Sequence, residues 1–375
     1  MTARIRDFLR NRSGDGPCLV VDLDVVRENY LGFAKALPDT RVFYAVKANP
    51  APEVLSLLAA LGSCFDAASF PEIELVLAAG ATADRISYGN TIKKERDVAR
   101  AYALGVRLYA VDCQAEVEKV ARAAPGSRVF CRILSDCVGA EWPLSRKFGC
   151  EPAMAVDVLE HAHRLGLEPH GVSFHVGSQQ RNPHAWDRAL AAAAAVFREC
   201  GERGLTLSMV NLGGGFPTRY LRNVPTVKTY GAAIFRALRR HFGNRIPETI
   251  IEPGRGMVGN AGVIEAEVVL VSKKSESDDV RWVYLDIGKF GGLAETMDES
   301  IRYPIRTPRG GEVGPCVLAG PTCDSADVMY EREPYLLPVS IEIGDKLLIE
   351  GTGAYTATYS AVAFNGFAPL KTFHI

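Results

Sequence analysis

An alternation of short apolar segments and amphipathic segments runs through the chain to about residue 260. Short apolar runs bounded by turn residues predict buried strands, and apolar residues spaced three and four apart predict helices. We expect eight strands, at residues 41–46, 64–68, 85–88, 107–111, 128–134, 171–175, 208–212 and 248–252. We expect helices between them, near residues 52–61, 71–79, 93–104, 114–123, 152–165, 184–203 and 229–242.

A further helical stripe, from Asp24 to Leu37, precedes the first of these strands. Eight strands that alternate with helices predict an α/β fold, a closed (β/α)8 TIM-like barrel of parallel strands. An open doubly wound sheet is the alternative, because strand counts made from sequence err by one or two.

The pattern changes after residue 260, where apolar segments follow one another without helices. Strands are expected there at residues 263–271, 282–285, 316–318 and 339–349, the last with a turn at 344–345. Residues 17–22 read as one more strand. A chain of 375 residues exceeds the usual size of a single core. We therefore predict a barrel domain over 23–261 and an all-β domain formed by 1–22 and 262–375.

Composition excludes several classes of function. The formal net charge is −1 and no basic stripe is present, which argues against nucleic acid or a membrane surface as a partner. The nine cysteines include no C-x-x-C pair, so neither a zinc site nor a redox motif is expected. The N-terminus lacks an apolar signal core. Together with reduced thiols, this predicts a cytoplasmic protein without a metal.

A lysine stands at the end of the first barrel strand. Val42–Val46 are apolar or aromatic, Lys47 follows them, and Asn49-Pro50 ends the run. One interpretation is that the ammonium group simply reaches solvent at the loop. The other is that a desolvated amine holds an aldehyde as a Schiff base, because burying an unpaired lysine is costly.

Four more polar residues lie at or near the ends of other predicted barrel strands. They are Asp66, Arg132, His175 and Glu252. In parallel barrels the chemistry gathers at the carboxyl ends of the strands. We therefore expect these side chains and Lys47 to meet at one mouth, although each alone is compatible with a packing role.

Two glycine-rich turns follow the seventh and eighth strands, Gly213-Gly214-Gly215 and Pro253-Gly254-Arg255-Gly256. Barrels commonly bind phosphate with backbone N–H groups of these loops, and Ser178 would add a hydroxyl. The alternative is that the triple glycine only relieves crowding in a tight turn.

The spacing Gly254-x-Gly256-x-x-Gly259 also matches a dinucleotide fingerprint. That motif requires a following helix, whereas a strand is expected here, so we reject it.

A phosphate cradle, a reactive lysine and a carboxylate at one barrel mouth indicate a pyridoxal 5′-phosphate (PLP) site. Glu252 beside the pyridine nitrogen would keep it protonated and make the ring an electron sink. His175 would stack on the ring. Asp66 and Arg132 would fix the charges around Lys47.

Six segments occur in the order of a known family: 43–49, 173–178, 213–216, 252–255, 320–324 and 353–355. The chain resembles, over nearly its whole length, the fold-type III PLP-dependent basic amino acid decarboxylases, above all the ornithine and the bacterial lysine/ornithine decarboxylases. These share the alanine racemase-like fold. The resemblance implies four catalytic residues, Lys47, His175, Glu252 and Cys323. It implies as cofactor-binding residues Lys47, Asp66, Arg132, His175, Ser178, Gly213, Gly214, Gly215, Glu252, Gly254, Arg255 and Tyr355.

The family also implies a homodimer whose active sites are shared across the interface. Cys323 would come from the partner subunit and reprotonate the α-carbon. Asp324 would receive the distal ammonium of the substrate, and Phe364 would form an aromatic wall. Lys147 and Asp327 resemble an ion pair between subunits. The loop 136–146 lies where it would cover the mouth, and the sequence does not fix its conformation.

One departure from the family concerns the substrate. The resemblance implies Tyr303 as a substrate residue, together with Asp324 and Phe364. In eukaryotic ornithine decarboxylases a Tyr-Asp pair precedes the shared site, but here Tyr303 is followed by Pro304. Asp324 would then be the main amine anchor, with help from water or from one of three nearby acids, Glu295, Asp298 or Glu299. We expect decarboxylation of L-ornithine to putrescine in polyamine biosynthesis. Lysine, which gives cadaverine, is the alternative or second substrate, because one methylene is worth only about 1–3 kcal/mol.

Three other functions were weighed. An alanine racemase needs a weakly activated ring, which Glu252 would not provide. A diaminopimelate decarboxylase needs a cationic or amide-rich site for the distal carboxylate, which Asp324 opposes. A cofactor-free regulatory homologue would tolerate loss of the lysine, the glycines or the thiol, and all of these are present.

Overall fold

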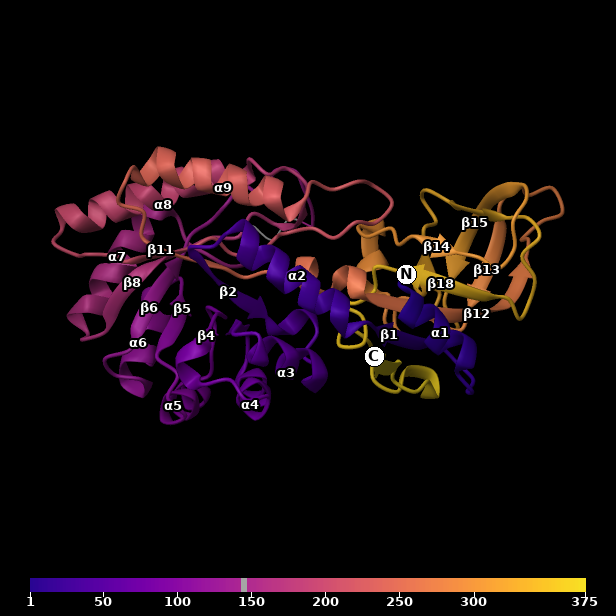
Figure 1. The fold of residues 1–375 in the computed structure, drawn as a ribbon, viewed down its shortest axis with the longest axis horizontal. Helices are drawn as coiled ribbons and strands as arrows, with labels where there is room; N and C mark the ends of the chain where they lie inside the picture. The colour runs from indigo at the N-terminus through magenta and orange to yellow at the C-terminus, as the bar shows by residue number, and fades with distance from the viewer. Residues whose placement is uncertain (143–146) are drawn as a thin grey trace. The chain divides into compact units, whose positions relative to one another are not determined.

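The computed structural model describes residues 1–142 and 147–375 (Figure 1). They divide into two compact units. The barrel unit comprises residues 27–217 and 224–257, and the β-unit comprises residues 1–26, 218–223 and 258–375. The domain limits 23–261 and 262–375 stay a prediction.

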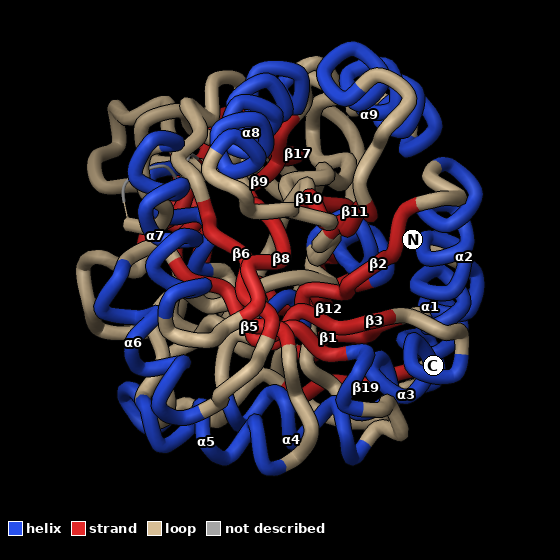
Figure 2. The backbone as a smooth tube through the Cα atoms, turned by 90° about the vertical axis from the view of Figure 1, so that its left-hand side faces the viewer, coloured by secondary structure: helices blue, strands red, loops and turns tan. Residues whose placement is uncertain are grey.

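In the described part of the chain, eight parallel strands close into a barrel in the order β10-β11-β2-β3-β4-β5-β6-β8 (Figure 2). Closure is made by β11 and β2, where Thr249 is in register with Thr40. The predicted TIM-like barrel is thus confirmed and the open sheet is wrong. The strands are β2 (Thr40–Ala45), β3 (Cys64–Ala67), β4 (Ile86–Tyr88), β5 (Leu108–Val111), β6 (Arg128–Arg132), β8 (Glu168–Ser173), β10 (Met209–Asn211) and β11 (Glu248–Ile251).

The helices surround the strands (Figure 2). Their starts follow local chemistry, as at α4, where the Ser69 hydroxyl accepts from Glu72 N and the Glu72 carboxylate accepts from Ala68 N, a reciprocal cap. The helices are α2 (Leu23–Ala36), α3 (Pro52–Ala60), α4 (Phe70–Ala78), α5 (Glu95–Ala103), α6 (Gln114–Ala123), α7 (Pro152–Arg164), α8 (Ala185–Glu202), α9 (Val227–Phe242) and the short α10 (Arg255–Val258).

The barrel interior contains a cluster of buried apolar residues from six of the strands: Phe43, Cys64, Leu108, Ala110, Phe130, Met209 and Ile250. Such layers fill a barrel rather than leave a pore. Polar residues of the same strands are therefore placed at the strand ends, where they can gather.

The β-unit contains a nine-stranded sheet. The N-terminal strand β1 pairs antiparallel with β12 and parallel with β19, so the predicted joining of this unit by the N-terminal strand is confirmed. The strands are β1 (Cys18–Val21), β12 (Gly262–Ser272), β13 (Arg281–Leu285), β14 (Ile305–Arg306), β15 (Val313–Ala319), β16 (Val328–Met329), β17 (Tyr335–Pro338), β18 (Lys346–Glu350) and β19 (Lys371–His374).

Two details of this unit differ from the sequence analysis. The expected strand at 339–349 is wrong over 339–345, which connect β17 to β18. The Asp345 carboxylate accepts from Glu342 N there, a local turn bond that competes with strand pairing. A helix, α1 (Ala3–Asn11), was not predicted; Thr2 caps it, and Ile5 anchors it in the core.

Candidate active site

Lys47 and Asp66 form an ion pair at the barrel mouth. Lys47 lies in a short 3-10 turn (Val46–Ala48) that directly follows β2, and Asp66 lies in β3. The Lys47 Nζ is 3.0 Å from Asp66 Oδ2. The lysine side chain is 48% exposed and the aspartate 4%. The lysine is therefore accessible in the single chain and held by a buried carboxylate, and its role as a Schiff-base lysine stays a prediction.

The backbone beside Asp66 is shaped around its carboxylate. A Cβ atom added at Gly89 would lie 1.7 Å from Asp66 Oδ1, so only glycine fits there. This oxygen is buried and has no hydrogen-bond partner among the described residues. Its charge is therefore available to the groups around it, of which Lys47 is the nearest cation.

Glu252 follows β11 and is mostly buried. Its carboxylate accepts a hydrogen bond from Asn211 Nδ2, and its backbone N donates to Gly213 O at 2.9 Å. Burial, with a smaller effect of the Asp66 charge, raises the pKa of Glu252 to about 7. Three groups oppose this rise: Lys47, Asn211 and Arg132. A cation brought next to this carboxylate would therefore stabilise its ionised form.

His175 lies just beyond β8 and is held as a neutral imidazole. Its Nδ1 accepts from Gly177 N at 3.0 Å, which places the ring proton on Nε2. Burial, followed by the charges of Arg132 and Lys47, holds the pKa of His175 well below its usual range. A neutral ring at this position suits stacking on an aromatic group.

Arg132 ends β6, and its guanidinium lies over the ring of Phe148 at 5.3 Å. Burial lowers the pKa of Arg132 from its usual value, against the attraction of Glu252, Asp66 and Asp112. Asp66, Arg132, His175 and Glu252 thus lie close enough to Lys47 or to one another for their charges to interact. The structure brings these residues together at one mouth.

Ser178 and Arg255 supply donors on the same unit. The Ser178 hydroxyl is 3.3 Å from an Arg255 Nη atom and 3.4 Å from its Nε, and Arg255 is 3% exposed. A buried guanidinium beside a hydroxyl is a suitable donor set for a phosphate. Gly254 directly precedes Arg255, and its carbonyl accepts from Met257 N.

The three glycines after β10 are crowded against neighbouring backbone. An added Cβ would lie 2.1 Å from Phe174 O at Gly213, 2.6 Å from Glu252 O at Gly214, and 2.5 Å from Gly177 O at Gly215. Crowding is therefore one reason for glycine at these three positions, and a phosphate role for the N–H groups of Gly214 and Gly215 stays a prediction. The Gly213 N–H is already used, because it donates to the Asn211 side chain at 2.9 Å.

The other predicted site residues belong to the β-unit. Tyr355 has a positive φ of 56°, a strained conformation that is frequent at functional sites. Cys323 and Asp324 are exposed in a loop after β15, and Phe364 is 37% exposed. The loop is ordered by its own bonds: Cys323 N donates to Asn365 Oδ1 at 2.9 Å, and Asp324 Oδ1 accepts from Ala326 N at 2.8 Å.

Asp327 organises this loop from within. It is 2% exposed, and its carboxylate accepts from Lys289 N at 2.7 Å, from the Thr322 hydroxyl at 2.8 Å and from Thr322 N at 3.2 Å. For Asp327 the family resemblance implies only an ion pair between subunits, with Lys147. Its bonds within its own chain show a structural role that holds the segment of Cys323 and Asp324.

Tyr303 is placed in the interior of the β-unit. It is 1% exposed and packs edge-on against Tyr220, and its backbone is bonded by Tyr330 and Tyr335. A direct substrate contact by Tyr303 would require the ring to leave this packing. Its predicted place among the substrate residues therefore has no support in its surroundings.

The three acids named as auxiliary amine anchors differ in exposure. Glu299 accepts from Arg302 Nη1 at 2.9 Å and from Arg332 N at 2.6 Å, whereas Asp298 is 75% exposed and lies 3.5 Å from Arg332 Nη2. Glu295 is 6% exposed. Of the three, Asp298 is the most accessible to a ligand.

Part of the loop 136–146 is described. Its residues Ala140–Trp142 form β7, which pairs antiparallel with β9 (Ser178–Gln180), directly beside the predicted phosphate donor Ser178. The Cys137 thiol also donates to His175 O at 3.4 Å. The rest of the expected mouth cover, residues 143–146, lies outside the described residues.

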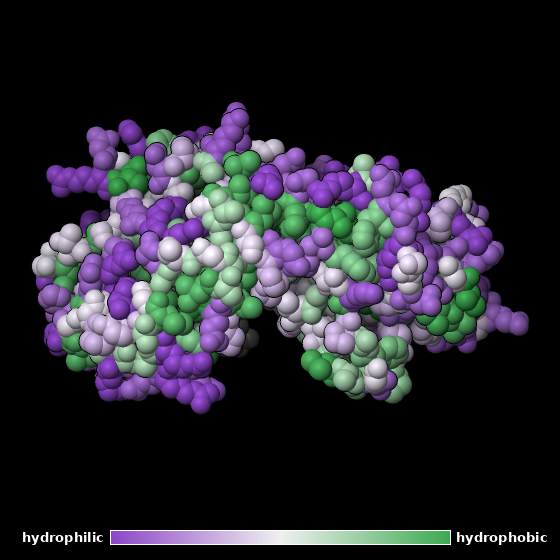
Figure 3. Space-filling model, turned by 60° about the horizontal axis from the view of Figure 1, so that its bottom comes forward, coloured by the Kyte–Doolittle hydropathy of each residue, from purple (hydrophilic) through white to green (hydrophobic). Residues whose placement is uncertain are grey.

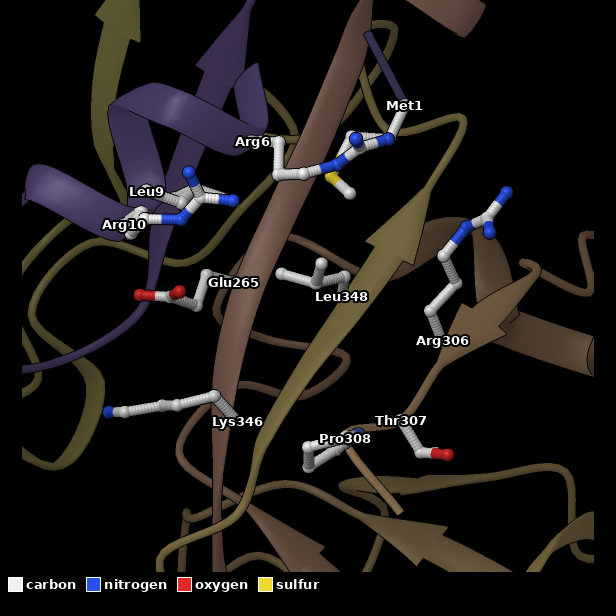
Figure 4. A pocket seen from close by; sticks show the side chains of 10 residues that line it. All are labelled: Met1, Arg6, Leu9, Arg10, Glu265, Arg306, Thr307, Pro308, Lys346 and Leu348. Atoms are coloured by element: carbon white, nitrogen blue, oxygen red, sulfur yellow. The ribbon is translucent and has the colours of Figure 1, made fainter. Parts of the chain in front are cut away.

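The β-unit contains a cavity of about 240 Å³ (Figure 4). Arg6, Arg10, Arg306 and Lys346 line it with Leu9 and Leu348. Three of these four cations have anionic partners, since Arg306 pairs with Glu350, Lys346 with Glu267 and Arg10 with Asp7. No predicted catalytic residue lines this cavity, and we do not regard it as the active site.

Two absences hold for residues 1–142 and 147–375. No His, Cys, Asp and Glu side chains gather there in a group that could hold a metal ion. No helix there has both the length and the apolar character that a bilayer crossing requires.

A family model described as the pyridoxal binding domain of pyridoxal-dependent decarboxylases matches residues 23–259. The chain therefore belongs to the pyridoxal-dependent decarboxylases, and its cofactor is PLP. The residues at the mouth fit this cofactor: an accessible amine for the aldehyde, a buried carboxylate for the ring nitrogen, and a guanidinium with a hydroxyl for the phosphate. The family resemblance seen in the sequence is confirmed.

Three relatives are informative. The chain is 38% identical to the lysine/ornithine decarboxylase of Selenomonas ruminantium, over 94% of this chain and 87% of that one. The lysine/ornithine decarboxylase of Vibrio vulnificus, solved with cadaverine, has a TM-score of 0.88 and 34% identity, covering 100% of this chain and 99% of that chain. Antizyme inhibitor 2 of Xenopus laevis is 35% identical, over 93% and 78% of the two chains.

Proposed function

We propose that this PLP-dependent decarboxylase acts on basic amino acids, with L-ornithine as the main substrate, putrescine as its product and L-lysine as a second substrate. The observation that carries the proposal is the buried Glu252 carboxylate at the mouth that also holds Lys47. The relatives named as lysine/ornithine decarboxylases support the substrate class. We also retain polyamine biosynthesis as the pathway and the cytoplasm as the location.

The barrel residues would prepare the reaction. Bound PLP supplies an electron sink for the electrons left at the α-carbon when carbon dioxide departs. Lys47 would hold the cofactor aldehyde between turnovers, and Asp66 would keep the Lys47 amino group in place while the substrate has displaced it. Glu252 would hold a proton on the ring nitrogen. Neutral His175 would pack on the ring without adding a charge.

Phosphate binding would rest on Arg255 and Ser178, joined by backbone N–H groups of Gly214 and Gly215 and by Tyr355. The buried guanidinium of Arg255 would supply the charge, because ion pairs are stronger away from water. This set would fix the cofactor through its phosphate. Lys47 could then release the cofactor aldehyde to the substrate without loss of the cofactor.

The β-unit would supply the substrate-facing residues. Asp324 is an exposed carboxylate and would receive the distal ammonium of the substrate, while the exposed Cys323 thiol would return a proton to the α-carbon. We propose that they act on the partner's barrel in a homodimer. Their exposure in a single chain supports this, because side chains that bind and protonate a substrate normally need enclosure.

Direct competition tests the choice of substrate. Equal concentrations of L-ornithine and L-lysine are given to the PLP-loaded enzyme, and putrescine and cadaverine are quantified together. We expect both products, with putrescine in excess by up to about 200-fold, the most that one methylene provides. An excess of cadaverine would overturn the preference for ornithine.

The same assay tests the reaction class. Formation of neither amine by protein that has bound PLP would overturn the decarboxylase assignment for basic amino acids. Absence of both PLP binding and amine formation would instead favour the cofactor-free regulatory alternative, of which the similarity to an antizyme inhibitor is an example. Diaminopimelate is added as a third substrate in a control. Its distal carboxylate would be opposed by the acidic Asp324, so we expect no turnover of it.

A further inference from the structure

Asn211 occupies the centre of a small hydrogen-bond ring at the mouth. It is the last residue of β10 and is 1% exposed. Its Nδ2 donates to the Glu252 carboxylate, and its Oδ1 accepts from Gly213 N at 2.9 Å. Glu252 N donates in turn to Gly213 O at 2.9 Å. Three residues from the ends of two neighbouring strands are thus bonded in a closed set.

Chemistry fixes the orientation of the Asn211 amide. A backbone N–H can only donate, so the amide oxygen must face Gly213. The amide nitrogen is then left facing Glu252, where it can only donate. A carboxylate that receives such a donor is favoured in its ionised form, and Asn211 indeed opposes the rise in the pKa of Glu252.

No other residue type of this size performs both tasks at all pH values. Aspartate at position 211 could accept from Gly213 N, but its second oxygen would face Glu252 and could donate only while protonated. Leucine would leave the Gly213 N–H and the Glu252 carboxylate without these partners, which is costly for buried groups.

We propose that Asn211 is a positioning residue that holds Glu252 oriented toward the cofactor ring and ties it to the triple-glycine turn. The inference rests on the proposed role of Glu252. The charged groups that act on Glu252 from other elements are Lys47, Asp66 and Arg132. They act through charge, whereas Asn211 makes a directed bond and so sets where the carboxylate points.

Cofactor affinity, measured without turnover, tests the proposal. PLP is titrated into the cofactor-free protein at several pH values between 5.5 and 9, and binding is followed by absorbance. For Asn211→Leu we expect affinity about 10- to 100-fold weaker at every pH, the loss of a hydrogen bond to a charged group. For Asn211→Asp we expect affinity near that of the wild type at low pH and weaker affinity as pH rises and its proton is lost.

The control is Asn244→Asp, the same change at an exposed turn of the barrel unit, which should leave the profile unaltered. A profile of Asn211→Asp that superimposes on the wild type would overturn the proposal, whether or not Asn211→Leu folds. Glu252→Gln distinguishes failure of the proposed role of Glu252 from failure of the proposed role of Asn211. If Glu252→Gln binds PLP as the wild type does, the role of Glu252 fails first. If it binds weakly while both Asn211 variants bind normally, only the present inference fails.

Discussion

The barrel mouth and the loop that holds Cys323 and Asp324 differ in how well a single chain encloses their side chains. At the mouth, Glu252 is mostly buried and bonded by Asn211, and Arg255 is 3% exposed. In the loop after β15, Cys323 and Asp324 are exposed, although their backbone is firmly held.

The difference separates cofactor binding from substrate binding. A group that tunes a cofactor must be positioned before the cofactor arrives, and burial with bonded neighbours achieves this. Residues that meet the substrate are left open in one chain. The segment 361–369, which follows Tyr359 closely in sequence, is also exposed throughout. The exposed fraction of Val362 is 85%. On the face shown in Figure 3, hydrophobic residues (green) are visible among hydrophilic ones (purple).

The largest expected effect comes from removing the lysine of the mouth. Lys47→Ala should lower kcat by at least about 10³-fold and abolish the visible absorption of the bound cofactor, because no other amine is expected to hold the aldehyde. The control is Lys94→Ala, which removes an exposed lysine of the same unit. A Lys47→Ala protein that keeps both the absorption and the turnover would show that the mouth does not hold the cofactor.

Removing the exposed thiol should have the next largest effect. Cys323→Ala should lower kcat by about 10²-fold or more, typical of a lost general acid, with little change in cofactor absorption. Cys113→Ala, in the barrel unit, is the matched control. Equal kcat for the two variants would remove Cys323 from the reaction.

Mixing the two inactive proteins, Lys47→Ala and Cys323→Ala, then tests whether sites are shared. If subunits exchange, about one quarter of all sites carry both intact residues in heterodimers, and a similar fraction of activity should return. Sites built within one chain would give no recovery after verified subunit exchange.

Loss of the charge on Asp324 should affect binding more than chemistry. Asp324→Asn should raise KM for ornithine and lysine by about 10- to 100-fold, because it removes a charged partner of the ammonium group. Asp298→Asn makes the same change at another exposed acid of the same unit, and we expect less than about a threefold effect. A larger rise in KM for Asp298→Asn than for Asp324→Asn would identify Asp298 as the residue that binds the distal ammonium group.

The smallest expected effect concerns pH and folding of the cofactor-free protein. The pKa of Glu252 is raised to about 7 in the fold, so its protonated form stabilises the protein below about pH 4.5 and this contribution is lost as pH rises through 7. Glu252→Gln should remove this loss, which is on the order of 2 kcal/mol in the free energy of unfolding. Urea unfolding at pH 5 and pH 8 measures it.

Glu202→Gln, at the exposed end of α8, is the control for that measurement. A wild-type protein whose stability falls between pH 5 and 8 as much as that of Glu252→Gln would show that Glu252 does not titrate in this range. The Glu252 carboxylate would then be more accessible to water than its hydrogen bonds suggest.

The barrel could be predicted from the sequence because its signal is local. Each strand is a short apolar run between turn residues, and each helix has its own stripe, so eight repeats gave the number and order of the strands. The positions of Lys47, Asp66, His175 and Glu252 followed, because a parallel barrel places every strand end on one face.

The β-unit was less predictable because its partners are distant in sequence. The strand expected at 339–349 is replaced in part by a connection, and α1 carries too few buried residues to reveal itself. Asn211 was missed for a related reason. An asparagine before a glycine turn is ordinary in sequence, and only the approach of Glu252, 41 residues away, gives it a partner.

The sequence by itself determined the strand and helix order, the family and the chemical set at the mouth, since these depend on local periodicity and on residue types at strand ends. The tertiary structure decided which of those residues are held and which are open. It shows Lys47 half-exposed on a buried aspartate, Tyr303 packed in a core and Asp327 bonded within its own loop. Burial and hydrogen bonding depend on neighbours far along the chain, and no local pattern encodes them.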